Sequence, residues 1–325
     1  MMSRRDLLSA FMTGAAGLLW KARVLSAKAS QPSTKINFDV PSGACDCHVH
    51  IFDPQQFPFV AGRGYTPEVA LIDELLSVHK VLHMDHVVVV QPSVYGTDNR
   101  CTVDAIRKLG GRARGVAVID EKTTDSALDE MNRAGVRGIR LNFNQAGVAD
   151  PAAARQRVQS AIQRVKPLNW HIQINTVPAM IDALASDLSD SSVPIVFDHF
   201  GGALEQAGEG TRQKGFAAIV NLVHTGKAYV KISAAADQTP DHGAHLEEVA
   251  PLARALVSAN PQRILWGTNW PHPDAAPRSG RKNTDLAPLQ QTDDGRILNL
   301  LPGWVPDAAT RHMILVENPA KLYGF

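Results

Sequence analysis

His48 and His50 are separated by one residue in the stretch 44–50, which has the apolar character of a buried β-strand. Residues two apart on a strand point to the same face, so the two imidazoles are expected to project together. His199 ends another strand-like segment, 194–199. Imidazole nitrogens that converge at one end of parallel strands could bind one metal ion or hydrogen-bond one substrate oxygen. The residues alone leave both chemistries open.

The segment 265–273, Leu-Trp-Gly-Thr-Asn-Trp-Pro-His-Pro, begins as an apolar run and breaks at Gly267 into polar and rigid residues. This pattern is typical of a buried strand that ends by delivering side chains into a site. Asn269 and His272 are the candidate site residues here. Asn269 poses a chemical problem, because an amide is not basic near neutral pH and cannot take a proton from water.

Two arginines, Arg137 and Arg140, lie three apart on the fourth strand-like segment of the chain, so they point to opposite faces. Arg140 is nearer the carboxyl end and is expected to face inward, where a guanidinium needs a carboxylate or an anionic ligand. Arg137 is expected to form a salt bridge outside. Lys231 and Ser233 share one face of 228–233, which fits either a structural ion pair with a capping hydroxyl or a functional pair.

The chain alternates strand-like and helix-like segments from residue 44 onward. Eight such units predict a single (β/α)8 TIM barrel over 44–325, with its active site at the carboxyl ends of the strands. A doubly wound open sheet is the alternative, but no Gly-x-Gly-x-x-Gly or P-loop follows any strand. The expected strands are 44–50, 86–91, 113–119, 138–142, 171–175, 194–199, 228–233 and 263–267. The expected helices are 67–82, 99–109, 124–134, 151–166, 178–187, 211–224, 244–259 and 307–318. Ser93, Asn99 and Gln173 are further polar residues at or just after the expected strand ends.

The composition is that of an ordinary globular enzyme. The 325 residues are 44% hydrophobic and 20% charged, and the net charge of +1 gives no reason to expect nucleic acid as a partner. Three cysteines exclude a fully paired disulfide framework, and Cys45 and Cys47 are expected to be buried apolar residues.

The first 29 residues resemble a targeting segment more than part of a fold. Arg4-Arg5 precedes a mildly apolar run, and Ala27-Lys28-Ala29 forms a small-x-small cleavage site. This pattern predicts a twin-arginine export signal over 1–29 and a periplasmic location. The run is too short and too rich in glycine and alanine for stable membrane insertion. Residues 30–43 are expected to be a polar linker.

Five motifs in this order, over roughly 44–325, resemble the amidohydrolase superfamily, and within it the branch of 2-pyrone-4,6-dicarboxylate lactonase and sugar-lactone hydrolases and isomerases. The motifs are Asp46-Cys47-His48-Val49-His50, Val90-Gln91-Pro92-Ser93, Gly135-Val136-Arg137-Gly138, Asp198-His199-Phe200-Gly201 and Trp266-Gly267-Thr268-Asn269-Trp270-Pro271-His272-Pro273.

The resemblance implies a lactone substrate and no metal cofactor. It implies that His48, His50 and His199 polarise the lactone carbonyl. It also implies that Tyr65, Ser93 and Arg140 hold the substrate, and that an aspartate on the eighth strand activates water. Asn269 stands at that aspartate position. Asn99, Gln173, Ser233 and His272 complete the expected substrate contacts.

Three further departures from this branch change the charge of the site. The dicarboxylate lactonase pattern has arginines where this chain has Gly202 and Asp237, and an asparagine where it has Asp274. Arginine is the usual clamp for a carboxylate. The expected substrate is therefore a neutral or monoanionic lactone, with Arg140 holding any remaining carboxylate and a hydroxy acid as the product.

Three functions follow from these residues. The first is a lactone hydrolase or isomerase in which another base, such as His50, His199 or Asp274, replaces the missing aspartate. The second is a Zn²⁺-dependent hydrolase or decarboxylase that holds the metal with His48, His50 and His199. The third is an exported barrel that binds a lactone without turning it over. The loop 274–306 could act as a lid with cationic residues or be a solvated excursion.

Overall fold

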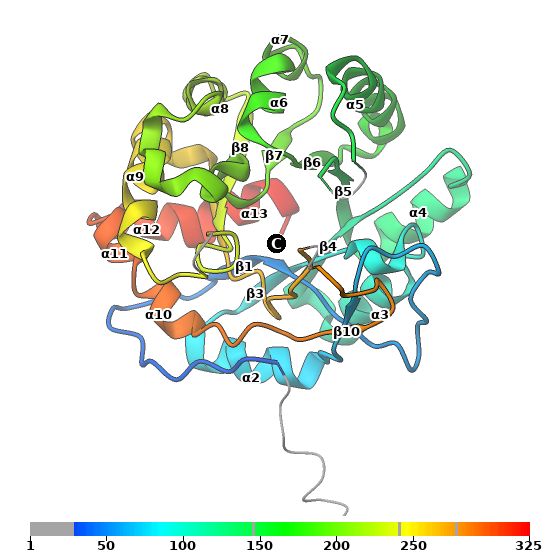
Figure 1. Ribbon diagram of the computed structural model, residues 1–325, viewed down its shortest axis with the longest axis horizontal. Coiled ribbons are helices and arrows are strands. Elements are labelled where there is room, and N and C mark those ends of the chain that lie inside the picture. The colour runs from blue at the N-terminus through cyan, green and yellow to red at the C-terminus, as the bar shows by residue number, and fades with distance from the viewer. Residues whose placement is uncertain (1–28, 145–146, 240–241, 277–278) are drawn as a thin grey trace, which may run out of the picture.

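A computed structural model describes residues 29–144, 147–239, 242–276 and 279–325. Eight parallel strands follow one another around a barrel in chain order, with helices on the outside (Figure 1). The predicted (β/α)8 barrel is therefore confirmed. The strands are β1 (Cys45–Val49), β3 (His86–Val90), β4 (Ala113–Ala117), β5 (Val136–Asn142), β6 (His171–Asn175), β7 (Ile195–Phe197), β8 (Ala228–Ser233) and β9 (Ile264–Gly267).

The barrel closes between β1 and β9, where the segments that carry His48, His50 and Asn269 meet. The backbone N–H of Asn269 donates to the carbonyl of His48 over 2.9 Å, and that of His50 donates to the carbonyl of Trp270 over 2.8 Å. Gly267 permits this approach, because a Cβ there would lie 2.8 Å from the backbone nitrogen of His48. Closure of the barrel and placement of the histidines therefore depend on the same contacts.

The outer helices are more broken in the second half of the chain than the sequence predicts. Four of the expected helices, 178–187, 211–224, 244–259 and 307–318, contain interruptions or changes of helix type. The α-helices are α2 (Ile72–Leu82), α3 (Arg100–Leu109), α4 (Asp125–Ala134), α5 (Pro151–Val165), α6 (Pro178–Ala183), α7 (Ala185–Ser189), α8 (Phe216–His224), α9 (Ala250–Ala259), α10 (Asp294–Leu298), α11 (Leu301–Trp304), α12 (Ala308–His312) and α13 (Asn318–Tyr323). A π-helical segment, Met313–Glu317, joins α12 to α13.

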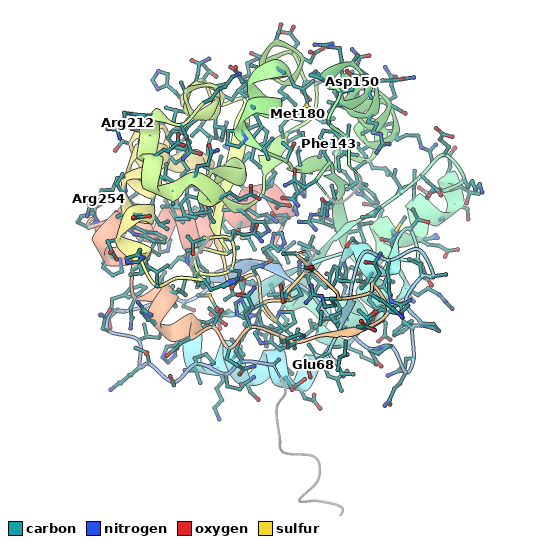
Figure 2. The ribbon with its side chains drawn as sticks, in the orientation of Figure 1. Glu68, Phe143, Asp150, Met180, Arg212 and Arg254 are labelled. Carbon is teal, nitrogen blue, oxygen red and sulfur yellow. The ribbon has the colours of Figure 1, made fainter. Side chains whose placement is uncertain are left out.

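Local capping explains where the better-predicted helices begin. The Asp150 carboxylate accepts hydrogen bonds from the backbone N–H groups of Ala152 and Ala153, and Pro151 occupies the first turn of α5. Figure 2 labels Asp150 at this helix start. Thr124 caps α4 in the same way, and α4 ends at Gly135 in the left-handed conformation.

The loop 274–306 is more ordered than the sequence indicates. It contains β10 (Leu286–Ala287), which pairs in parallel with β2 (Thr66–Pro67), and then α10 and α11. This pairing holds the loop next to Tyr65. Arg281 donates to Asp274 over 2.9 Å, so this cation is used within the loop, and Arg278 lies outside the described residues.

Residues 30–43, predicted to be a linker, lie against the barrel. The Ser30 carbonyl accepts a hydrogen bond from the Trp270 indole over 3.2 Å, and Thr34 binds the carboxylate of Asp293. The predicted export signal lies almost wholly outside the described residues. Within the described part of the chain, no helix has the length and apolarity needed to cross a bilayer. Cys45 and Cys47 are buried and unpaired, as expected.

Candidate active site

Three imidazole rings meet at the carboxyl ends of β1 and β7, near the centre of the barrel. The ring centroids of His48 and His50 are 5.0 Å apart, and those of His48 and His199 are 4.6 Å apart. All three residues are buried. The structure thus brings together the three histidines that the sequence placed on two separate strands. Their roles depend on which nitrogen of each ring carries a proton.

His50 presents an unprotonated nitrogen to the site. Its Nδ1 lies 2.8 Å from the carbonyl oxygen of Val90, which can only accept a hydrogen bond. Nδ1 therefore carries the proton, and Nε2 keeps its lone pair. Burial, reinforced by the nearby positive charge of Arg140, lowers the pKa of His50 to about 3. His50 is a neutral acceptor at physiological pH.

His48 lies between a cation and a carboxylate. Its Nδ1 is 3.4 Å from Lys231 Nζ and 3.2 Å from Asp198 Oδ1. Its Nε2 is buried and has no hydrogen-bond partner among the described residues. Burial lowers the pKa of His48 well below its usual value, so the ring is neutral. A buried polar atom without a partner is costly, which marks Nε2 as the position of a ligand.

His199 is oriented by a hydroxyl. Its Nδ1 lies 2.9 Å from Ser233 Oγ, and burial lowers its pKa to about 4. The backbone of His199 has a φ of 47°, in the left-handed region that most residues avoid. The contact with Ser233 fixes the direction of the ring after this sharp turn. Ser233, expected to bind substrate, is thus committed to His199.

The Asp198 carboxylate lies beneath the histidines and interacts with the buried cations. Its Oδ2 accepts from Arg140 Nε over 2.9 Å and from Gln173 Nε2 over 3.1 Å. Burial would raise the pKa of Asp198, but Arg140, His48 and Lys231 hold it well below the usual range. Arg140 faces inward as predicted. The sequence places Gln173 among the substrate contacts, whereas its amide lies here between protein groups.

Lys231 is fully buried and completes this network. Its Nζ donates to Gln173 Oε1 over 2.6 Å and lies 3.8 Å from Asp198 Oδ1. Burial lowers the pKa of Lys231 to about 8, so the ammonium form still predominates at pH 7. Two cations, Arg140 and Lys231, and one anion, Asp198, give this cluster one net positive charge at neutral pH.

A second network holds Asn269. The Asn269 Nδ2 donates to Asp237 Oδ2 over 3.0 Å, and Thr292 Oγ1 donates to Asp237 Oδ1 over 2.9 Å. Because an ionised carboxylate only accepts hydrogen bonds, the amide nitrogen must face Asp237 and the Asn269 carbonyl must face away. Asn269 has a φ of 72°, which asparagine adopts more readily than most residues. Its side chain is thus fixed in direction.

His272 lies behind this pair between two carboxylates. Its Nδ1 is 2.8 Å from Asp237 Oδ2 and its Nε2 is 3.1 Å from Asp294 Oδ2. Burial opposes protonation, but Asp237 and Asp294 hold the pKa of His272 well above 6.5. His272, expected to contact substrate, is fully buried and supports Asp237 instead. Asp294, in the loop 274–306, had no sequence signal.

This pKa predicts a pH-dependent contribution of His272 to stability. The native pKa exceeds the unfolded value of about 6.5, so the stabilisation is complete below that pH and is lost as pH rises through the native pKa. Each pKa unit of difference contributes about 1.4 kcal/mol. Urea unfolding of wild type and His272→Gln at pH 6.0, 7.5 and 9.0 should show their difference shrinking as pH rises. Parallel pH dependences would contradict this account.

Four other residues from the sequence analysis take clear positions. The Tyr65 phenol is buried, hydrogen-bonds Ser93 and lies near Arg140, and burial raises its pKa to about 12. The Asn99 amide binds backbone groups just after β4, because its Nδ2 donates to the carbonyl of Val118 and its Oδ1 accepts from the N–H of Val118. Arg137 points outward as predicted, but it binds oxygens of Asn132 instead of a carboxylate.

The Asp46 carboxylate, part of the first motif, fastens the two closing strands together. Its Oδ1 accepts from the backbone N–H of Thr268 over 3.0 Å, and its Oδ2 accepts from the Thr268 hydroxyl over 2.7 Å. Asp46 therefore aligns β1 with the segment that carries Asn269. Its contacts make it a support for the histidines.

The sequence and structure both match known enzymes. The amidohydrolase family model matches residues 45–325. The 4-sulfomuconolactone hydrolase of Rhizobium radiobacter is 33% identical over 294 residues, covering 90% of this chain and 93% of that protein. The 2-pyrone-4,6-dicarboxylate hydrolase of Comamonas testosteroni is 31% identical over 299 residues, covering 89% and 93%. A solved structure from Agrobacterium tumefaciens superposes with a TM-score of 0.73 at 25% identity, covering 90% of this chain and 98% of that one.

Proposed function

Because the chain belongs to the amidohydrolase family, whose members are enzymes, we propose that it is a hydrolase that opens a neutral or monoanionic lactone with water. The observation that carries this proposal is the set of three buried, neutral imidazoles next to Asn269. Two relatives that the chain matches over most of its length are named as hydrolases of lactones, which supports the same reaction class.

Two of the imidazoles are assigned to the lactone carbonyl. The Lys231 ammonium can donate to His48 Nδ1, and the Ser233 hydroxyl can donate to His199 Nδ1. His199 then carries its proton on Nε2 and can donate to the carbonyl oxygen, and His48 does the same in the tautomer whose Nδ1 accepts from Lys231 instead of donating to Asp198 Oδ1, 3.2 Å away. Preorganised donors of this kind stabilise the negative charge that develops on a carbonyl oxygen during attack.

The third imidazole is assigned to the attacking water. His50 Nε2 is unprotonated because Nδ1 binds the Val90 carbonyl. Its pKa of about 3 makes it nearly as basic as an ordinary aspartate, whose pKa is about 3.9. Replacement of the eighth-strand carboxylate by Asn269 therefore leaves a proton acceptor of similar strength in the site. This assignment gives His50 a role opposite to the carbonyl contact that the sequence implies.

Asn269 is assigned to orienting the water. Asp237 holds the amide nitrogen, so the Asn269 carbonyl can accept one hydrogen bond from the water. The water donates its other proton to His50 Nε2, and its oxygen bonds to the lactone carbonyl carbon. The tetrahedral intermediate then expels the ring oxygen, which takes the proton from His50. The ring C–O bond breaks and the product is a hydroxy acid.

A Zn²⁺ ion held by His48, His50 and His199 is the other cofactor assignment. Such an ion would lower the pKa of a bound water. The surroundings do not fit it well, because Arg140 and Lys231 already leave the adjacent cluster with one net positive charge. Asp198 Oδ2 is committed to Arg140 and Gln173, which leaves only Oδ1 near His48 and His199, and Asn269 offers an amide where a carboxylate ligand would be stronger. We propose that no metal is required.

Chelation tests this assignment. Purified protein treated with a strong chelator and then dialysed should contain well below one equivalent of zinc, iron, cobalt, nickel or manganese by plasma mass spectrometry, and should keep its kcat. Loss of activity that returns on adding Zn²⁺ in proportion to bound metal would overturn the metal-free proposal.

Activity itself is tested with a panel of five- and six-membered lactones, unsubstituted or carrying one carboxylate or sulfonate. Ring opening by wild type should release one equivalent of acid, measured with a pH indicator. Failure of the folded protein to open any lactone in the panel would leave lactone hydrolysis without support.

The Arg4-Arg5 signature supports export to the periplasm as part of the proposal.

A further inference from the structure

Residues 30–37 form a strap that lies against α10 and is bound to both of its ends (Figure 1). The Asp293 carboxylate, just before the helix, accepts hydrogen bonds from the backbone N–H and the hydroxyl of Thr34 over 3.0 and 2.7 Å. The Asn299 side chain, just after the helix, accepts from the backbone N–H of Asn37 over 2.9 Å. The strap therefore fixes the position of α10 along its whole length.

The Asp293 carboxylate is the centre of this contact. Burial raises the pKa of Asp293, but hydrogen bonds from Ser33 and Thr34 lower it to about 2. The carboxylate is therefore ionised at physiological pH and accepts from charge-assisted hydrogen bonds, which are stronger than neutral ones. It also accepts from the backbone N–H groups of Gly295 and Arg296 in the first turn of α10. One side chain thus joins the strap to the helix.

The strap and α10 approach each other too closely for a side chain between them. A Cβ on Gly295, in the first turn of α10, would lie only 2.1 Å from the carbonyl oxygen of Thr34. The obstacle is backbone, which cannot rotate out of the way as a side chain can. Ile36 of the strap also packs against the hydrophobic core. The contact is therefore specific, although the sequence of the strap suggests a linker.

The residues directly before and after this carboxylate belong to the network behind Asn269. Thr292 Oγ1 donates to Asp237 Oδ1 over 2.9 Å, and Asp294 Oδ2 lies 3.1 Å from His272 Nε2. Asp237 and His272 contact each other, and Asp237 accepts from the Asn269 amide. The strap is thus attached between the two residues that support the partners of Asn269.

A second contact of the strap reaches the segment that carries Asn269 itself. Trp270 follows Asn269 in the chain, and its indole N–H donates to the carbonyl of Ser30 over 3.2 Å. Trp270 and Ser30 are both buried, so little water competes for this hydrogen bond. The strap therefore contacts the asparagine segment at one end and the supporting segment at the other.

We propose that the strap is a positioning element of the active site. By holding Asp293, it keeps the two neighbours of that residue in contact with Asp237 and His272. These contacts fix the direction in which the Asn269 carbonyl points. The effect on catalysis rests on the proposed role of Asn269 in orienting the water, whereas the effect on His272 does not.

Gly295→Ala tests the strap with the smallest change to the full chain. The new methyl group cannot fit against the carbonyl of Thr34, so the strap and α10 must move apart. Alanine is a better helix former than glycine, so α10 itself is not weakened. Gly303→Ala is the matched control, because a Cβ at this position of α11, in the same loop, meets no atom within 4 Å.

The first readout is the protonation of His272, followed by the ¹⁵N chemical shifts of its ring during a pH titration of the full chain. Burial lowers the pKa of His272, but the carboxylates of Asp237 and Asp294 on its two sides raise it well above 6.5. Displacement of Asp294 in Gly295→Ala should lower the proton affinity of His272 at least about tenfold, because a neighbouring opposite charge shifts a pKa by about 1–3. Gly303→Ala should titrate as wild type does.

The second readout is steady-state kinetics with the best lactone of the panel. Gly295→Ala should lower kcat about ten- to hundredfold, since a misplacement of about 1 Å can cost a factor of about 10². KM should change much less, because Asn269 is assigned to the water and not to the lactone. Ser33→Ala combined with Thr34→Val removes two hydroxyl donors to Asp293 without adding bulk, and should cause smaller losses of the same kind. Thr34→Ser keeps its hydroxyl and should resemble wild type.

The two readouts separate the strap from the proposed reaction. An unchanged titration of His272 in Gly295→Ala, or in the Ser33→Ala, Thr34→Val protein if the first variant does not fold, would overturn the strap. A lowered proton affinity with unchanged kcat would overturn its role in catalysis. Because the titration requires no turnover, failure of wild type to open lactones would count against the proposed function alone.

Discussion

Replacement of His50 by alanine is expected to lower kcat by ~10²–10⁴-fold, the usual cost of losing a general base. The reason is that Val90 fixes the His50 proton on Nδ1, which makes Nε2 the acceptor for the proton of the attacking water. KM should change much less, because the water contact matters mainly in the transition state. Steady-state kinetics with the best lactone of the panel measures both quantities.

A chemical rescue and a matched control separate this role from a structural one. Imidazole added to His50→Ala should restore part of kcat, since a small base can enter the vacated space. His171→Phe removes another buried histidine of the barrel, whose pKa is also lowered to about 3. His171 is the first residue of β6 and so lies at the end of the barrel opposite to the site. That variant should keep wild-type kcat. Full activity of His50→Ala would show that the proton goes elsewhere.

Asn269→Asp is expected to lower kcat by at least about tenfold at pH 7, although it restores the carboxylate that related enzymes are expected to carry. The new carboxylate would lie about 3.0 Å from that of Asp237, because Asn269 Nδ2 and Asp237 Oδ2 are now at this distance. Two carboxylates so close cannot both ionise easily, so one takes up a proton and the water loses its fixed acceptor. Kinetics at pH 5–9 would show the raised pKa.

The double exchange Asp237→Asn with Asn269→Asp returns one amide and one carboxylate to this pair and should recover much of the activity. Asp274→Asn serves as the control, since the Asp274 carboxylate is held by Arg281 and has no assigned catalytic role. It should leave kcat within about threefold of wild type. If Asn269→Asp alone raises kcat a hundredfold, Asp237 and Asn269 do not work as the pair described above.

The barrel fold, and the residues that lie near its centre, could be predicted from the sequence. The one-residue spacing of His48 and His50 sets their common face on any strand, and the β-branched run before Val90 marks a buried strand. Arg140 could be placed inward by the same periodicity. These inferences are local, because each depends on strand geometry within a few residues.

The roles of the same residues could not be predicted from local spacing. The acceptor role of His50 depends on the Val90 carbonyl, 40 positions away, and the direction of Asn269 depends on Asp237, 32 positions away. In the sequence, Asp237 stands where the related enzymes are expected to have an arginine. In the structure, its carboxylate accepts hydrogen bonds from Asn269, His272 and Thr292. Hydrogen bonds between distant segments decide protonation, and no periodic pattern encodes them.

The segment 274–306 shows the same limit at the level of the fold. Its short elements, β10 and α10, have too few residues to produce a recognisable period, and they form because they pack on β2 and under His272. No pattern in the sequence therefore indicated that Asp294 lies in the site.

The most direct test of the proposed function is ring opening of a monoanionic six-membered lactone in ¹⁸O-labelled water, with the product analysed by mass spectrometry. The proposed function predicts that wild type gives a hydroxy acid with one ¹⁸O atom in the new carboxylate, and that His50→Ala gives it ~10²–10⁴-fold more slowly. Recovery of unchanged lactone, or of an isomerised lactone without label, would contradict it.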